Sequence, residues 1–252
     1  MRISEENATA EKVALITGAA KRIGAAIAET LHAASMRVAV HYLHSEEEAT
    51  TLCEKLNRIR TDSATCFRAD LIQDGGPEEL IQRVLEWGGA LDLLVNNASS
   101  FYPTPLGEID ETAWTDIIGT NLKAPLFLAQ SAAPALREAK GNIINIVDIH
   151  AQRPLRDHHV YGVAKAGLVM LTRSLAKDLA PEVRVNGIAP GAIVWPEGGI
   201  TNDLKNTILD QVPLGRAGTP ADIAGAVRFF VNDATYATGQ IIAIDGGRSV
   251  GW

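Results

Sequence analysis

The sequence has few of the features that mark several large classes of protein. Its two cysteines, Cys53 and Cys66, do not have the spacing of a redox or zinc pair, and two thiols are too few for a disulfide framework. A net charge of −7 argues against nucleic acid as the main partner. No apolar run reaches the ~18 residues of a membrane span, and residues 1–10 lack the apolar core of a signal peptide. The sequence therefore predicts a cytoplasmic protein of a reducing compartment, without a membrane partner.

Short apolar runs alternate with longer helical patterns along the chain. The runs are rich in β-branched residues and occupy 13–17, 37–42, 64–69, 91–95, 142–147, 183–189 and 240–244. Helical patterns occupy 18–34, 45–60, 77–87, 112–137, 159–180 and 220–231. Near-continuous apolar strands separated by helices are typical of a parallel sheet that is covered on both faces. The pattern predicts a Rossmann-like, doubly wound α/β fold of about seven strands.

No repeat, low-complexity tract or long linker divides the 252 residues, so we expect a single domain over 1–252. Residues 1–10 are polar and are expected to form a flexible tail. The least regular stretch is 191–206, and we expect a substrate lid over 191–215. Ligands of such folds bind outside the carboxyl ends of the strands, which directs attention to the residues that follow each apolar run.

The segment TGAAKRIG, from Thr17 to Gly24, lies between the first expected strand and the first expected helix. A tight turn at this point lets backbone N–H groups and the helix N-terminus meet a pyrophosphate. The usual G-x-G-x-x-G spacing is absent, and two glycines at a junction also suit a bare tight turn. The segment alone leaves both interpretations open.

The end of the second strand bears on the choice of cofactor. An NAD site normally places an acid there for the ribose 2′-hydroxyl, whereas this chain reads HYLHS and has no acid until position 46. Ser45 is also a good N-cap for the next helix, and the two roles are compatible. Hydrogen-bond donors gathered at the two loops favour the 2′-phosphate of NADP(H); they are Lys21, Arg22, His41, His44 and Ser45.

An ordered set of motifs resembles the short-chain dehydrogenase/reductase family over essentially the whole chain. The set is T-G-x-x-x-R-x-G, Asp70-Leu71, Asn96-Asn97-Ala98, Asn121, Tyr161-x-x-x-Lys165 and Pro190-Gly191. More narrowly, TGAAKRIG, HYLHS, VNNASSFYPTPL and the position of Asp148 resemble the pteridine reductases within that family. The resemblance implies an NADPH-dependent reductase of pterins or folates that assembles as a homotetramer.

The resemblance also implies roles for single residues. Asp70 and Leu71 would border the adenine, and His44 stands where some relatives carry arginine. Ser99 and Phe101 would face the pterin, with the phenyl ring stacked on it opposite the nicotinamide. Asn121 would hold the lysine through a backbone or water contact. The expected cofactor contacts are Gly18, Lys21, Arg22, Ile23, Gly24, His41, His44, Ser45, Asp70, Leu71, Asn97, Ala98, Ser99, Tyr161, Lys165, Pro190 and Gly191.

Tyr161 and Lys165 are four residues apart and share one face of the expected helix. A phenol with a pKa of ~10 is a poor acid–base group at neutral pH. A nearby ammonium, or a positive nicotinamide, lowers that pKa and makes the tyrosine a workable proton donor. A tyrosine and a lysine at this spacing also occur on helix surfaces without a catalytic role, and the rest of the motif set favours catalysis.

Asp148 ends the apolar run NIINIV, where most members of the family that the chain resembles have a serine. An ionised aspartate cannot donate a hydrogen bond and would repel a developing alkoxide. It suits a C=N bond in a ring, where a proton must reach nitrogen. A purely structural alternative is that Asp148 caps the loop that follows.

Four further residues complete the expectations. His150, His158 and His159 have no metal-site spacing, so no metal is expected, and they are interpreted as solvated or substrate-edge residues. Trp195 would either cover the pterin or pack within its loop. The favoured function is reduction of a pterin C=N bond by NADPH. Alternatives are a carbonyl reductase, such as a 3-oxoacyl reductase, and a non-catalytic NADP(H) sensor.

Overall fold

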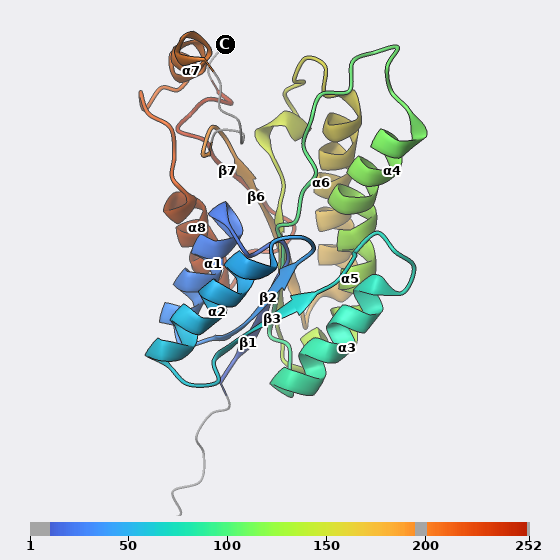
Figure 1. Ribbon diagram of the computed structural model, residues 1–252, viewed down its shortest axis with the longest axis vertical. Coiled ribbons are helices and arrows are strands. Elements are labelled where there is room, and N and C mark those ends of the chain that lie inside the picture. The colour runs from blue at the N-terminus through green and yellow to red at the C-terminus, as the bar shows by residue number, and fades with distance from the viewer. Residues whose placement is uncertain (1–10, 195–200, 251–252) are drawn as a thin grey trace, which may run out of the picture.

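A computed structural model describes residues 11–194 and 201–250, and within them seven parallel strands form one sheet with helices on both faces (Figure 1). The strand order is β3-β2-β1-β4-β5-β6-β7. This confirms the predicted doubly wound α/β fold. The strands are β1 Val13–Ile16, β2 Arg37–Tyr42, β3 Ala64–Arg68, β4 Leu93–Asn96, β5 Asn142–Ile146, β6 Arg184–Pro190 and β7 Ile241–Ile244.

The helices fill the connections between the strands, and none of those described is long and apolar enough to cross a membrane. Local signals explain several of their ends. Thr219 and Asp222 form a capping box at the start of α8, and glycines with positive φ flank α3 at Gly75 and Gly89. The helices are α1 Arg22–Ala33, α2 Glu46–Ile59, α3 Gly76–Gly88, α4 Glu111–Ile118, α5 Ala124–Glu138, α6 His159–Leu179, α7 Asn202–Leu209 and α8 Pro220–Asn232.

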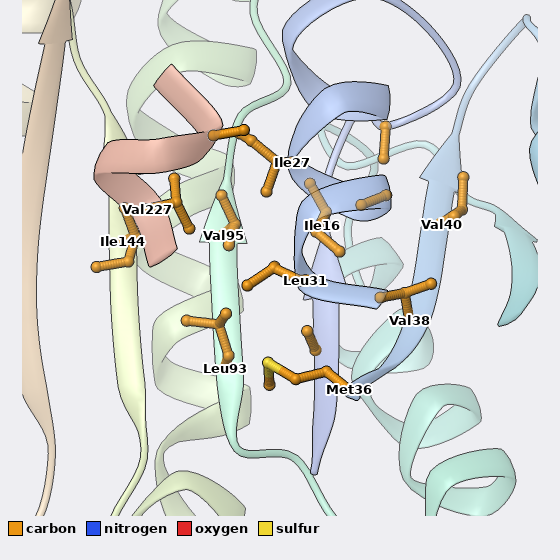
Figure 2. Packing of buried hydrophobic residues seen from close by; sticks show 14 of the residues in the cluster. Ile16, Ile27, Leu31, Met36, Val38, Val40, Leu93, Val95, Ile144 and Val227 are labelled. Atoms are coloured by element: carbon orange, nitrogen blue, oxygen red, sulfur yellow. The ribbon is translucent and has the colours of Figure 1, made fainter. Parts of the chain in front are cut away.

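Alternate residues of each strand enter two separate cores, because successive side chains of a strand point to opposite faces. Ala14 and Ile16 pack with α1, α2 and α8, whereas Val13 and Leu15 pack with α3, α5 and α6. Figure 2 shows the first core, in which Ile27 and Leu31 of α1 lie over the sheet. Burial on both faces explains why the strands read as continuous apolar runs.

Two expectations about helices need correction. The pattern over 112–137 predicts one helix, but a π-helical turn at Gly119–Lys123 (η1) separates α4 from α5. Residues 191–206 were expected to be irregular, yet α7 begins at Asn202. The helix has only eight residues, and all its side chains are at least partly exposed, so no buried apolar face marks it in the sequence. The proposed tail over 1–10 lies outside the described residues.

Candidate active site

The site lies where the carboxyl ends of four neighbouring strands meet. Thr17, Asn97, Asp148 and Gly191 follow β1, β4, β5 and β6, which are adjacent in the sheet. The strand order reverses between β1 and β4, and ligands of open α/β sheets bind at such a switch point. The fold therefore brings together motifs that the sequence separates by up to 174 positions (191 − 17).

The turn after β1 is shaped by glycines that no other residue could replace without movement. Gly18 has a φ of +59°, and a Cβ on it would lie 2.9 Å from the Cα of Ala98. A Cβ on Gly24 would lie 2.4 Å from the carbonyl oxygen of Gly18. The Nδ2 of Asn97 donates to the carbonyls of Thr17 at 2.8 Å and Gly18 at 2.9 Å. Asn97 thus fixes the turn.

The start of α1 suits an anion. The side chain of its N-cap residue, Lys21, makes no capping hydrogen bond to the first backbone N–H groups of the helix. Those amides and the helix dipole favour a phosphate at this end. Ile23 in the first turn packs against the core and anchors the helix. The close-fitting glycine turn and this helix start form a cradle that fits a dinucleotide pyrophosphate.

His41 does not lie where a 2′-phosphate would contact it. Its side chain is buried; Nδ1 accepts a hydrogen bond from the N–H of Gly18 at 3.0 Å, and Nε2 lies 3.1 Å from the carbonyl of Ala69. Burial lowers the pKa of His41 to about 4, so the ring is neutral at neutral pH. His41 supports the glycine turn from below, and the expectation of a phosphate contact is corrected accordingly.

The other hydrogen-bond donors expected to contact a 2′-phosphate lie at or near the surface. His44 is exposed, and Ser45 precedes α2 without making a side-chain cap hydrogen bond, which corrects the expected capping role. Lys21 forms an ion pair with Glu48 at 2.6 Å, and a phosphate would have to compete with that carboxylate. Arg22 has a φ of +55°, and its Nη2 donates to the carbonyl of Val194 at 3.3 Å.

The expected adenine border and the end of β6 also lie at this edge of the sheet. The carboxylate of Asp70 accepts a hydrogen bond from the N–H of Ile72 at 3.1 Å, and Leu71 is buried. Gly191, after Pro190, packs so tightly that a Cβ would lie 2.6 Å from the Cβ of Asp245. These residues shape the rim by backbone geometry.

A tyrosine and an aspartate face each other at the carboxyl end of the sheet. The Oη of Tyr161, on α6, donates to Oδ2 of Asp148 at 2.8 Å. The other carboxylate oxygen accepts from the N–H of His150 at 2.8 Å and caps the short turn Ile149–Ala151 (η2). Asp148 therefore both caps the loop and contacts the tyrosine. The capping is thus observed, and a role of Asp148 in proton transfer stays a prediction.

The expected lowering of the tyrosine pKa is not found. Burial and the neighbouring charge of Asp148 raise the pKa of Tyr161 well above its ordinary value, and only the hydroxyl of Ser99 opposes them. The Nζ of Lys165 lies 5.6 Å from the ring centroid of Tyr161. The sequence argument weighed the charges of the lysine and of an oxidised nicotinamide, whereas desolvation and a hydrogen-bonded carboxylate dominate in the fold.

Lys165 is buried beneath Tyr161. Its Nζ donates to the carbonyl of Ile146 at the end of β5, at 3.0 Å. Burial lowers the pKa of Lys165 to about 8, against the opposing charge of Asp148. This carbonyl is the hydrogen-bond partner of Lys165 in the described part of the chain, and a contact with Asn121 through water stays a prediction.

Asn121 holds a loop. It lies fully buried in η1; its Oδ1 accepts from Ser99 at 2.8 Å, and its Nδ2 donates to the carbonyls of Ser100 at 2.9 Å and Ile117 at 3.0 Å. Phe101, in the same loop, is 45 % exposed, and its ring lies edge-on to Tyr161 with centroids 4.8 Å apart. The ring of Phe101 also stacks on that of His158.

Two features were missed by sequence reasoning. A buried chain of hydrogen bonds runs from Asn96 to Asn145 at 2.8 Å and on to Thr172 of α6 at 2.8 Å. In addition, the charges of Asp148 and Asp245 act on Arg248 and oppose the burial that lowers its pKa. The asparagines within the apolar runs were a signal for the buried hydrogen bonds. No sequence signal marked Arg248.

Two other expectations concern ligands that the residues could hold. No cluster of three or more metal-ligating side chains occurs in 11–194 or 201–250. Trp195, the expected pterin cover, lies outside the described residues.

The chain is similar to known reductases over nearly its full length. A family model described as enoyl-(acyl carrier protein) reductase matches residues 18–249. Pteridine reductase 1 of Leishmania tarentolae is 38 % identical, with 94 % of this chain and 96 % of the relative aligned. The 3-oxoacyl-(acyl-carrier-protein) reductase FabG of Staphylococcus epidermidis is 36 % identical over 94 % and 98 % of the two chains. One from Staphylococcus aureus is 37 % identical over 94 % and 97 %.

The described fold agrees with these matches, because one parallel seven-stranded sheet carries the glycine turn and the tyrosine–lysine pair at its switch point. The chain belongs to the short-chain dehydrogenase/reductase family of NAD(P)(H)-dependent oxidoreductases.

Proposed function

We propose that the protein uses NADPH to reduce a C=N bond of a pterin ring, converting a dihydropterin or dihydrofolate to its tetrahydro form. The observation that carries this proposal is the hydrogen bond of 2.8 Å between the Tyr161 hydroxyl and the Asp148 carboxylate. A carbonyl reductase would be expected to present a hydroxyl at position 148, to donate to the substrate oxygen. A carboxylate there repels a developing alkoxide.

The protein's residues can hold and deliver a proton at a ring nitrogen. Tyr161 keeps its proton at neutral pH because its pKa is raised, so the donor form is fully populated. A ring nitrogen that has gained an electron pair is strongly basic, and a phenol of raised pKa can still protonate it. Asp148 orients the phenol before the transfer; the hydroxyl then turns from Asp148 to the ring nitrogen and gives up its proton, and the tyrosinate regains a proton from solvent. Lys165 places positive charge near the ring of Tyr161.

NADPH fits the cradle described above, and when bound it supplies the hydride. The glycine turn with Gly18 and Gly24, together with the start of α1, would hold the pyrophosphate. His44 and Ser45 are the surface donors best placed for the 2′-phosphate, because His41 is buried. Lys165 would also hold the nicotinamide ribose.

The similarity to 3-oxoacyl-(acyl-carrier-protein) reductases supports a second candidate, reduction of a 3-oxoacyl thioester. The identities of 36 % and 37 % are close to the 38 % of pteridine reductase 1, so identity does not decide between them. The Asp148–Tyr161 pair and the exposed ring of Phe101, which could stack on a flat heterocycle, favour the pterin.

A single assay separates the candidates. The loss of NADPH absorbance is followed with dihydrobiopterin, with an acetoacetyl thioester and with neither. We expect turnover with dihydrobiopterin. Turnover with the thioester alone would favour the carbonyl reductase, and binding of NADPH without turnover would favour a sensor.

Replacing the aspartate tests its role directly. We expect Asp148→Ser to retain the fold and NADPH binding but to lose most turnover with dihydropterin, since the carboxylate partner of Tyr161 is gone. Steady-state kinetics and an NADPH fluorescence titration measure both effects. Asp178→Ser, an exposed aspartate on α6, is the matched control and should leave turnover unchanged. Undiminished turnover of Asp148→Ser would contradict the proposal.

A further inference from the structure

We propose that Asp116 is a positioning residue that sets the ring of Phe101 against Tyr161, and so determines how tightly the substrate is bound. The inference rests on the proposed function, because it assigns Phe101 to the substrate side of that site. Asp116 lies near the end of α4 and would touch neither substrate nor cofactor. It acts through the two residues that flank Phe101.

Both neighbours of Phe101 are tied to the same carboxylate. The Oγ of Ser100 donates to Oδ1 of Asp116 at 3.0 Å, and the Oη of Tyr102 donates to Oδ2 at 3.0 Å. Burial and the Asp116 carboxylate raise the pKa of Tyr102 to about 12, which keeps its phenol protonated as a donor. Hydrogen bonds to a charged group are stronger than neutral ones. The backbone of Phe101 is therefore fixed from both sides.

The π-helical turn explains why Asp116 can share this task with Asn121. Residues five apart in an uninterrupted α-helix are separated by about 140° around its axis. The wider turn of η1, in which hydrogen bonds span five residues, reduces this separation. Asp116 binds the side chains of Ser100 and Tyr102, while Asn121 binds the side chain of Ser99 and the carbonyl of Ser100. These four hydrogen bonds, with a longer one of 3.3 Å from the hydroxyl of Ser100 to that of Thr120, hold residues 99–102.

The position of the Phe101 ring is what these bonds control. The ring is 45 % exposed and makes two aromatic contacts, one edge-on to Tyr161 and one stacked on His158 with centroids 4.7 Å apart. A half-exposed ring is not fixed by surrounding core. Its placement beside the catalytic phenol depends on the backbone on either side, and hence on Asp116.

Asp116→Asn keeps the size of the side chain but leaves one oxygen to serve two hydroxyl donors. Losing one charge-assisted hydrogen bond corresponds to about a tenfold effect on an equilibrium. We expect the KM for dihydrobiopterin to rise about tenfold, kcat to change less than about twofold, and NADPH affinity to stay unchanged. Glu111→Gln, an exposed carboxylate in the first turn of α4, is the matched control and should change none of the three.

The decisive comparison is made in a second background. If Asp116 acts through Phe101, Asp116→Asn should raise KM in the native chain but add nothing to Phe101→Ala. An equal rise in both backgrounds, or no rise in the native chain, would overturn the proposal. Ser100→Ala and Tyr102→Phe each remove one donor and should reproduce part of the rise, and they serve in its place should Asp116→Asn fail to fold.

A ligand-free measurement separates this proposal from the proposed function. The chain has five phenylalanines, so fluorophenylalanine labelling gives few ¹⁹F signals, and the signal absent in Phe101→Leu identifies position 101. We expect Asp116→Asn to shift and narrow that signal as the ring becomes freer. If the native enzyme does not turn over dihydropterin, the proposed function fails while this shift still supports the positioning role. An unchanged signal overturns that role.

Discussion

Helices α6 and α7 follow the two adjacent strands β5 and β6, yet the fold treats them in opposite ways. The 21-residue α6 buries nine residues, including Tyr161 and Lys165. The eight-residue α7 buries none, and its Leu204 is 48 % exposed. Segments with few buried contacts open at a low free-energy cost. The part of the candidate site that α6 carries is therefore preorganised, whereas α7 is held weakly.

Polar groups show the same contrast. In β2, β5 and α6, the side chains of His41, Asn145 and Lys165 are buried, and each is hydrogen-bonded within the protein. Such groups are costly to disturb, because an unsatisfied partner stays away from water. On the α7 side, the bond from Thr201 to the N–H of Leu204 spans 3.3 Å at the surface. Substitutions should therefore lower the free energy of unfolding strongly at these buried groups and weakly in α7.

The largest effect on stability is expected at His41 in acid. Its pKa is about 4 in the fold and 6.5 in the unfolded chain, so between these values the unfolded chain binds a proton that the fold excludes. The stabilisation is complete above pH 6.5 and is lost as the pH falls towards 4, by roughly 3 kcal/mol. Urea unfolding of the native chain and of His41→Gln, from pH 7.5 to 4, measures it.

Glutamine can accept from Gly18 and donate to Ala69 but does not titrate, so the variant keeps both bonds. Subtracting the free energy of unfolding of this variant from that of the native chain cancels the pH-dependent contributions of the carboxylates and of the other histidines. We expect the native chain to lose stability relative to His41→Gln as the pH falls. A difference that does not vary with pH would show that His41 is not a buried neutral group.

The next largest effect is expected at Asn145. Asn145→Leu removes the acceptor of the buried Asn96 amide and should lower the free energy of unfolding by about 2 kcal/mol. Asn206→Leu, the same exchange on exposed α7, is the matched control and should stay within about 0.5 kcal/mol. Urea denaturation measures both. Equal losses would mean that α7 is as firmly integrated as α6.

The fold and the closeness of Tyr161 to Lys165 could be predicted because they depend on local patterns. The continuous apolar runs indicate strands that are buried on both faces, and the four-residue spacing of Tyr161 and Lys165 indicates a shared helix face. The facing of Asp148 and Tyr161 also follows, since parallel strands and their helices meet at one edge. These inferences need only periodicity and topology.

What could not be predicted depends on packing between distant segments. The burial of His41 requires Gly18 and Ala69 to enclose it, 23 and 28 positions away. The raised pKa of Tyr161 reflects desolvation, which no spacing reveals. The π turn at η1 changes one hydrogen-bond register within an otherwise ordinary helical pattern. Each error arose where tertiary surroundings outweighed local chemistry.

The smallest effect on global stability is expected at Thr201, at the start of the exposed helix α7. Its hydroxyl oxygen caps α7, and Thr201→Ala should destabilise that helix by about 1 kcal/mol, while the free energy of global unfolding changes by less than about 0.5 kcal/mol. Thr207→Ala is the matched control, since its exposed hydroxyl donates to the carbonyl of Asp203 and caps no helix start. Hydrogen exchange of amides 202–209 and urea unfolding measure the two effects separately.

If the segment 191–215 closes over the substrate, Thr201→Ala should also raise the KM for dihydropterin while NADPH affinity stays the same. The reason is that a weaker α7 adds to the free energy of ordering this side upon binding, whereas the glycine turn and α1 remain intact. A loss of global stability above about 1 kcal/mol would place α7 within the cooperative core. A KM equal to that of Thr207→Ala would leave α7 outside substrate binding, and the contrast with α6 would then concern stability alone.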